Sequence, residues 1–167
     1  MAELSLQERL QPSLLDRLTD NEPDSNVESR AQRVLSLNRL KRSVLRDLAW
    51  LLNSGSLAMT EDLGPYPNVE NSVLNYGVSD LAGTTASATD VKALEREIRQ
   101  AILDFEPRIL ANSLKVKVNL NKEKMSRKTL SFLIEGQLWA QPLPVDLYLS
   151  TDLDLETGNA TVNETTG

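Results

Sequence analysis

The chain contains no cysteine and no histidine, and each absence excludes a class of chemistry. Without cysteine it has neither a disulfide framework nor a thiol nucleophile. Without histidine it lacks the usual general base at neutral pH and the commonest transition-metal ligand. We therefore expect no catalytic site of the Ser-His-Asp or Cys-His kind, no metal site and no cofactor.

Long apolar runs and excess positive charge are missing as well. No stretch approaches the roughly 20 apolar residues that span a bilayer, so we expect no membrane insertion. The net charge of −6 argues against nucleic acid as the main partner, because such binding relies on cationic side chains. The first residues lack a basic segment followed by an apolar core, which is not typical of a secretory signal. We expect a cytoplasmic protein.

A length of 167 residues suits one domain with arms. We predict an N-terminal arm over residues 1–26, one domain over 27–162 and a flexible tail over 163–167. The arm carries a cluster of leucines at Leu14, Leu15 and Leu18, which is too short to form a stable helix alone. It must dock either on its own domain or on a partner, and both alternatives stay open.

Two long helices are predicted inside the domain. The first spans 27–53, begins at the capping-box pattern of Ser25 and Glu28, and carries many Arg and Lys side chains beside its apolar stripe. Those cations form either a solvated face with salt bridges or a contact face for an acidic protein. The second helix lies within 89–108, with Thr89 as N-cap. Its stripe is the most regular in the chain and comprises Val91, Leu94, Ile98, Ile102 and Phe105.

The C-terminal half alternates with the two-residue period of β-strands. Strands are predicted over 114–120, 130–138 and 145–156, with a short β-prone segment at 160–162. Residues 54–88 carry many turn formers and should form an ordered irregular connection with about one helical turn. The expected fold class is α+β: two amphipathic helices packed on one face of a small antiparallel sheet.

Two features of the expected fold each allow two interpretations. Glu106, Pro107 and Arg108 form an acid-proline-base corner where the second helix stops, and this corner is either a turn alone or a docking point. The edges of the sheet either accept a strand from another chain or are guarded by charged side chains.

Four stretches then stand in an order and spacing that resembles one family. They are LQPSLLDRLTDNEPD, RDLAWLLN, SVLNYGVSDLAG and FEPR, at residues 10–24, 46–53, 72–83 and 105–108. Together they are similar to TssE, the baseplate wedge subunit of the bacterial type VI secretion system, which is related to the small wedge protein of contractile-phage baseplates. The family-motif residues are Arg46, Asp47, Trp50, Asn75, Tyr76 and Gly77.

The resemblance implies a structural role. It implies docking of Glu106, Pro107 and Arg108 on a helical bundle formed by the wedge proteins TssF and TssG, with TssK as a further baseplate partner. It implies that the sheet initiates the contractile sheath of TssB and TssC by strand addition. The implied sheath-contact residues are Leu114, Val116, Val118, Leu147 and Leu149. The protein would then reside in a membrane-docked baseplate on the cytoplasmic side.

Two other functions compete with this one. The family carries the label "lysozyme-like", and peptidoglycan cleavage needs two carboxylates flanking one bond. Candidates stand in the irregular connection, but their spacing selects no pair; they are Glu61, Asp62, Glu70 and Asp80. The second alternative is a regulatory adaptor-binding protein, because distant relatives of the fold block a protease adaptor. The complete set of motifs favours the baseplate.

Overall fold

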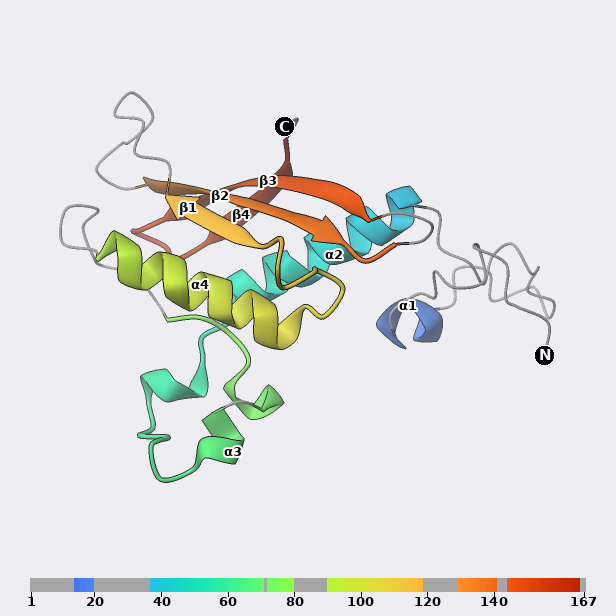
Figure 1. Cartoon of the computed structure of the whole chain (residues 1–167). Coiled ribbons are helices and arrows are strands. Elements are labelled where there is room, and N and C mark those ends of the chain that lie inside the picture. Colours follow the sequence, from blue (N-terminus) through green and yellow to red (C-terminus); the bar gives the residue numbers. More distant parts are fainter. Residues whose placement is uncertain are drawn as a thin grey trace.

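The structure is a computed structural model of the chain, and it describes residues 14–19, 37–70, 72–79, 90–118, 129–140 and 144–165. The capping box at Ser25, the start of the first helix and the link 121–128 lie outside these residues, as do Thr89 and most of the arm. The described elements form two layers, a four-stranded sheet with two long helices beneath it (Figure 1). The predicted α+β fold is confirmed.

The two helices bury the apolar stripes that the sequence predicts. α2 spans Leu37–Leu52 and buries Leu40, Val44, Leu48, Leu51 and Leu52, together with Ser43. α4 spans Val91–Phe105 and buries Leu94, Ile98, Ala101 and Ile102. The N-cap of α4 is Asp90, whose carboxylate accepts hydrogen bonds from the main-chain N–H groups of Lys92 and Ala93. The predicted cap at Thr89 is therefore wrong by one residue, since the aspartate side chain accepts from two of the free N–H groups of the first turn.

The sheet is a meander with the strand order β1-β2-β3-β4, and every pair is antiparallel. Its strands are β1 (Lys115–Val118), β2 (Thr129–Leu138), β3 (Val145–Asp154) and β4 (Ala160–Glu164). The third strand ends at Asp154 and not at Glu156 as predicted, because Leu155 turns into the core within the β3–β4 connection. β1 and β4 are the two edges.

The core lies between the sheet and the helices. β2 alternates strictly between buried and half-buried residues, and its buried side includes Leu130, Phe132 and Ile134. α4 packs beneath β1 and α2 beneath β4, so the helices together cover one face of the sheet (Figure 1). None of the described helices is both long and apolar enough to cross a bilayer.

The connection between α2 and α4 forms a protruding lobe, which we define as residues 56–70 and 72–79 (Figure 1). It contains the 3-10 turn η2 (Leu57–Met59), the short helix α3 (Pro67–Glu70) and the 3-10 turn η3 (Val73–Asn75). It is thus ordered and irregular as predicted, but with three helical turns where about one was expected. In the arm, α1 (Leu14–Leu18) forms a single short helix.

Candidate functional site

The Glu106-Pro107-Arg108 corner is a tight turn at the end of α4. The main-chain N–H of Ile109 donates to the carbonyl of Glu106 at 3.1 Å, which closes a four-residue β-turn with Pro107 at its second position. Glu106 has φ −124° and ψ 76°, outside the helical region, as expected before a proline. The helix therefore stops here as the sequence predicts.

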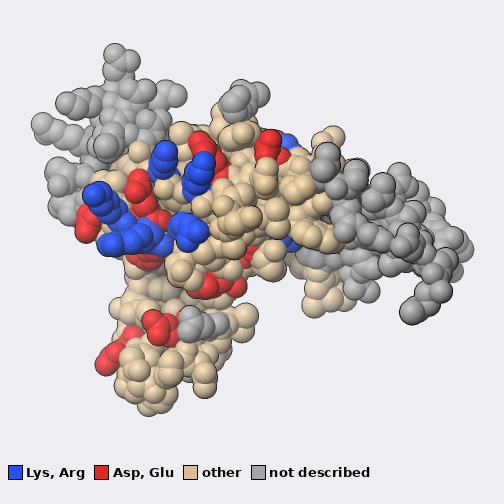
Figure 2. Space-filling view, in the orientation of Figure 1, with Lys and Arg blue, Asp and Glu red and all other residues tan. Residues whose placement is uncertain are grey.

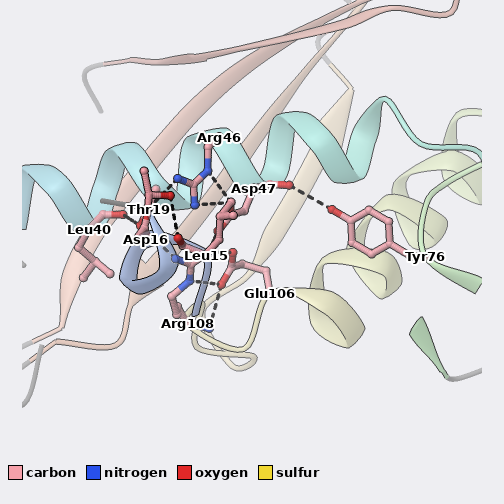
Figure 3. Close-up of polar contacts among 10 residues, drawn as sticks. Leu15, Asp16, Thr19, Leu40, Arg46, Asp47, Tyr76, Glu106 and Arg108 are labelled. Atoms are coloured by element: carbon pink, nitrogen blue, oxygen red, sulfur yellow. Dashed lines mark hydrogen bonds and ion pairs between the residues drawn. The ribbon is translucent and has the colours of Figure 1, made fainter. Parts of the chain in front are cut away.

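Arg108 is the centre of a polar cluster that joins this turn to α2 (Figure 3). Its Nε donates to Glu106 Oε1 at 2.6 Å and its Nη1 to Ser43 Oγ at 3.0 Å. Its Nη2 reaches both Glu106 Oε2 and Asp47 Oδ2. The Glu106 side chain is only 3% exposed, so it is a buried carboxylate that depends on Arg108 for its charge balance.

Arg46 extends the cluster toward the N-terminal arm. Its Nε donates to Asp47 Oδ1 at 2.9 Å and its Nη1 to Asp16 Oδ1 of α1 at 2.6 Å. All three leucines on α1 are exposed: Leu14 at 69%, Leu15 at 43% and Leu18 at 74%. The described part of the arm therefore docks on its own domain through a carboxylate and not through its apolar side chains.

The pKa values of the two guanidinium groups in the cluster are raised. Burial alone would lower the pKa of Arg108, but the hydrogen bonds and charges of Glu106 and Asp47 outweigh it and raise the pKa. The hydrogen bond with Asp16 raises the pKa of Arg46 against the opposing effect of burial, and Asp47 adds to the rise. Both guanidinium groups stay charged at any physiological pH, so the cluster is a fixed electrostatic scaffold.

Two exposed side chains belong to the segments that meet at this turn. Pro107 is exposed, and Trp139, which is 46% exposed, lies beside the turn because its main-chain N–H donates to the carbonyl of Arg108 at 2.7 Å. We call Pro107 and Trp139 the corner surface. Sequence reasoning named Pro107 but missed Trp139, whose only sequence signal is a large aromatic directly after a strand.

Most of the remaining motif residues support the cluster. Trp50 lies under the guanidinium of Arg46, with 5.2 Å between Cζ and the ring centroid. Tyr76 packs edge-on against Phe105 with ring centroids 5.2 Å apart, and burial, followed by the charges of Asp47 and Glu106, raises its pKa. The structure thus brings Arg46, Asp47, Trp50, Tyr76, Glu106 and Arg108 together.

Asn75 and Gly77 act in the lobe and its neck instead. The Asn75 side chain accepts from the N–H of Ala58 and donates to the carbonyl of Glu70, at 2.9 Å each. Gly77 has φ +133°, and a Cβ there would lie 2.3 Å from the carbonyl oxygen of Ser54. Only glycine allows the returning chain to pass so close to the end of α2.

Ser43 and Asp16 also belong to the cluster and were not predicted as site residues. Ser43 and Asp47 are four residues apart and share one face of α2, beside the apolar stripe. A polar pair in that position is the signal that could have indicated a buried partner. Nothing in the sequence alone connects Ser43 or Asp47 to Arg108.

The predicted sheath-contact residues have little exposed surface. Leu147 and Leu149 are fully buried on β3, an inner strand that pairs with β2 along its length and with β4 from Leu149 to Leu153. Leu114 and Val116 are buried at β1, and Val118 packs against the core. Their side chains support the sheet, so any contact through these strands would use the main chain at an edge.

The β1 edge is partly occupied by side chains from α4. Hydrogen bonding alternates along an antiparallel strand, so Val116 and Val118 direct their main-chain groups away from β2. The Val118 N–H donates to Glu95 Oε1 at 2.8 Å, and Arg99 Nε donates to the carbonyl of Leu114 at 3.3 Å. Among the described residues, the outward groups of Val116 have no partner.

The β4 edge is occupied in a similar way from α2. The side-chain amide of Asn53 accepts from the Ala160 N–H and donates to the Ala160 carbonyl, both at 2.8 Å, as a neighbouring strand would. Lys41 adds an ion pair with Glu164 at 2.6 Å. The outward main-chain groups of Val162 lie between these two contacts and have no partner in the described part of the chain.

The candidate carboxylates that the structure describes lie on the surface of the lobe. Glu61, Asp62 and Glu70 are exposed, and Asp80 lies outside the described residues. A cleft of about 220 Å³ between α2, α4 and the β3–β4 turn is lined by residues such as Asn53, Met59 and Phe132, and no Asp, Glu, Lys or Arg in the described part of the chain lines it. No group of three or more acidic side chains within the described ranges could hold a metal ion.

Comparison with known families shows to which protein family the sequence belongs. Residues 38–143, more than half of the chain, match the family of the baseplate wedge protein gp25. The chain belongs to this family. The match to gp25 runs from the start of α2 past the end of β2 and therefore includes both halves of the Arg108 cluster. No curated protein and no solved structure matches the chain significantly.

Membership of the gp25 family makes the protein a structural baseplate component that interacts with other baseplate proteins. This confirms the coarser part of the sequence-based prediction, that of a baseplate wedge protein. The cluster around Arg108 contains four of the six residues named from the sequence as a motif, Arg46, Asp47, Trp50 and Tyr76.

Proposed function

We propose that the protein is the wedge subunit of a type VI secretion baseplate and docks on a helical bundle of TssF and TssG through the corner surface. The observation that supports this is the contrast within three consecutive residues. Glu106 is buried and ion-paired, whereas Pro107 is exposed on a turn that the pair holds rigid. A turn whose shape is fixed in advance loses little entropy on binding.

The chemistry of the corner surface suits a helical partner. Trp139 is half exposed on a segment that is hydrogen-bonded to the turn, and exposed tryptophans are among the side chains that contribute most to binding energies at protein interfaces. The cluster beneath it keeps the turn in place and contributes the remaining exposed part of Arg108.

The test is co-purification with TssF and TssG of a Pro107→Glu, Trp139→Glu double variant. Both changes are on exposed side chains, so the Arg108 cluster and the fold should stay intact, as circular dichroism would check. Binding should fall at least tenfold, because two carboxylates would be desolvated in an apolar contact. The matched control is Leu37→Glu, an exposed apolar residue at the start of α2. Unchanged binding of the folded double variant would overturn the docking role.

Sheath initiation is the second part of the proposal. Strand addition from the sheath proteins TssB and TssC would occur at β1 or β4, where Val116 and Val162 offer free main-chain groups between the side chains that occupy each edge. Wedge binding and contact with TssK would use other surfaces. The protein would thus act in the cytoplasm, on a baseplate docked at the membrane, without a catalytic role.

A proline substitution in each edge strand tests whether β1 or β4 accepts the strand of the sheath protein. Val162→Pro removes an outward N–H without breaking a hydrogen bond to β3, and Val116→Pro does the same toward β2, although at a buried site. One of these variants should prevent sheath polymerisation while co-purification with TssF and TssG persists. If both folded variants still polymerise sheath, strand addition at these edges is refuted.

A further inference from the structure

The lobe between α2 and α4 exposes apolar side chains that neither the corner surface nor the sheet edges use. Val73 is 80% exposed, Leu74 is 68% exposed and Tyr66 is 61% exposed. Large apolar residues at such exposure, grouped on a small protruding element, typically mark a binding surface. We call Tyr66, Val73 and Leu74 the lobe tip.

The outward position of the lobe tip is built into the lobe. The two 2.9 Å hydrogen bonds of the Asn75 side chain, with Ala58 and Glu70, direct that residue into the lobe interior. Successive side chains in a 3-10 turn are about 120° apart, so Val73 and Leu74 are held on the other two sides. The hydroxyl of Ser72 caps the turn by accepting from the N–H of Leu74 at 3.2 Å.

The lobe is also fixed to the rest of the domain at a defined neck. Gly55 and Val78 form an isolated parallel bridge, and Val78 N–H donates to the Ser54 carbonyl at 2.9 Å. Gly77 passes close to the same carbonyl, and Tyr76 packs on Phe105 of α4. The lobe tip is therefore carried on an anchored support.

The charge around the lobe tip is of one sign. The exposed side chains Glu61, Asp62 and Glu70 lie on the lobe, and the sequence has no Lys or Arg between residues 47 and 91. The view in Figure 2 shows red acids and tan residues on the lobe, whereas the blue cations gather elsewhere on the molecule. A surface that binds here must supply both apolar contact and positive charge.

We propose that the lobe tip is a docking site for a second protein partner that presents an apolar pocket rimmed by Lys and Arg. A second copy of this chain fits less well. Its α2 does expose Arg39 and Arg42 together with Leu37 and Trp50. The chain as a whole, however, carries a net charge of −6, which opposes docking of one copy on the acidic lobe of another. This inference goes beyond the proposed function and does not depend on docking by the corner surface.

The first experiment places the photo-crosslinking residue p-benzoyl-phenylalanine at Leu74 of the full chain in cells that express the complete set of baseplate proteins. Leu37, an exposed leucine on α2, carries the same probe as the matched control. The expected result is an adduct from position 74, absent from position 37, with a peptide of another protein that combines apolar residues with Lys or Arg. Three results would overturn the proposal. They are an adduct with a second copy of this chain, an adduct with a peptide that lacks Lys and Arg, and no adduct above the level of the control.

The second experiment measures affinity for the protein so identified. Val73→Ser with Leu74→Ser should weaken binding about tenfold or more, because both side chains leave an apolar contact. Neutralising Glu61, Asp62 and Glu70 to their amides should flatten the dependence of Kd on salt. Circular dichroism confirms that the variants fold. Affinity that is unchanged in the double serine variant would refute the docking site even if an adduct forms.

Discussion

Removing the Arg108 guanidinium tests whether the cluster is a structural scaffold, and Arg108→Ala is the direct perturbation. Arg108 makes four side-chain hydrogen bonds, to Glu106, Ser43 and Asp47. After the substitution, the buried carboxylate of Glu106 keeps only the main-chain N–H of residue 108, at 3.1 Å in the present structure. A negative charge would then remain in a site that excludes water.

The magnitude follows from the burial of the partners. Breaking a buried ion pair by removing one partner costs about 3–5 kcal/mol. Arg108 and Asp47 keep 23% and 24% of their side-chain surface exposed, which favours the lower end, about 3 kcal/mol. Since 1 kcal/mol shifts the Tm of a domain of this size by about 2–4 °C, we expect Tm to fall by about 6–12 °C.

Urea unfolding followed by circular dichroism measures this loss, and two further variants sharpen it. Arg108→Lys keeps the charge but loses the forked geometry, so it should fall between wild type and alanine. Glu106→Gln combined with Arg108→Met leaves no stranded charge and should be more stable than Arg108→Ala alone. Two results would show that water already screens the cluster: a decrease in the free energy of unfolding of less than about 1 kcal/mol in Arg108→Ala, or a double variant that is no more stable than Arg108→Ala.

Three further perturbations probe the surroundings of the cluster and the edge. The pKa of Tyr76 is raised from 10.0 in the folded protein. The neutral tyrosine therefore stabilises the fold below about pH 10, and this contribution is lost as the pH rises through the pKa of the folded state. The free energy of unfolding of Tyr76→Phe should accordingly depend less on pH above about pH 10 than that of the wild type. Gly77→Ala should cost about 1–3 kcal/mol or more in urea unfolding, because a side chain at φ +133° meets the Ser54 carbonyl. Asn53→Ala should cost about 1–2 kcal/mol and accelerate hydrogen exchange of the Ala160 amide.

Each of these has an outcome that contradicts it. Parallel pH profiles for wild type and Tyr76→Phe would show that the tyrosine titrates normally. A Gly77→Ala variant as stable as wild type would mean that the neck can move away from α2. For the edge, Asn53→Asp keeps the acceptor for the Ala160 N–H, and if its exchange matched that of the alanine variant, the amide would owe its protection to something else.

The sequence predicted the parts of this fold that depend on local periodicity. The spacing of Leu94, Ile98 and Ile102 on α4 and the alternation of β2 follow from one buried face each, so they are visible in a short window of residues. Pro107 marked the end of α4 because the restriction it imposes on Glu106 is local. The family resemblance added the expectation of a baseplate wedge protein.

The partners of the site could not be predicted, because they depend on the packing of distant elements. Arg108 meets Asp47 only after α2 and α4 lie side by side under the sheet, and neither position carries a signal for the other. The predicted sheath contacts illustrate the same limit. Alternation identified Leu147 and Leu149 as strand residues but could not tell that β3 is an inner strand.

The side chains that occupy the sheet edges have a consequence for when the protein can assemble. If two copies of the chain paired edge to edge, each copy would lose a hydrogen bond between a side chain and its edge strand, such as that of Asn53 with Ala160 or of Glu95 with Val118. The two copies together would gain one set of main-chain hydrogen bonds in return. A strand from another protein whose main-chain groups are free would displace such a side chain from this chain only. If strands are added at these edges as proposed, the exchange would therefore favour a foreign strand over pairing between two copies of the chain.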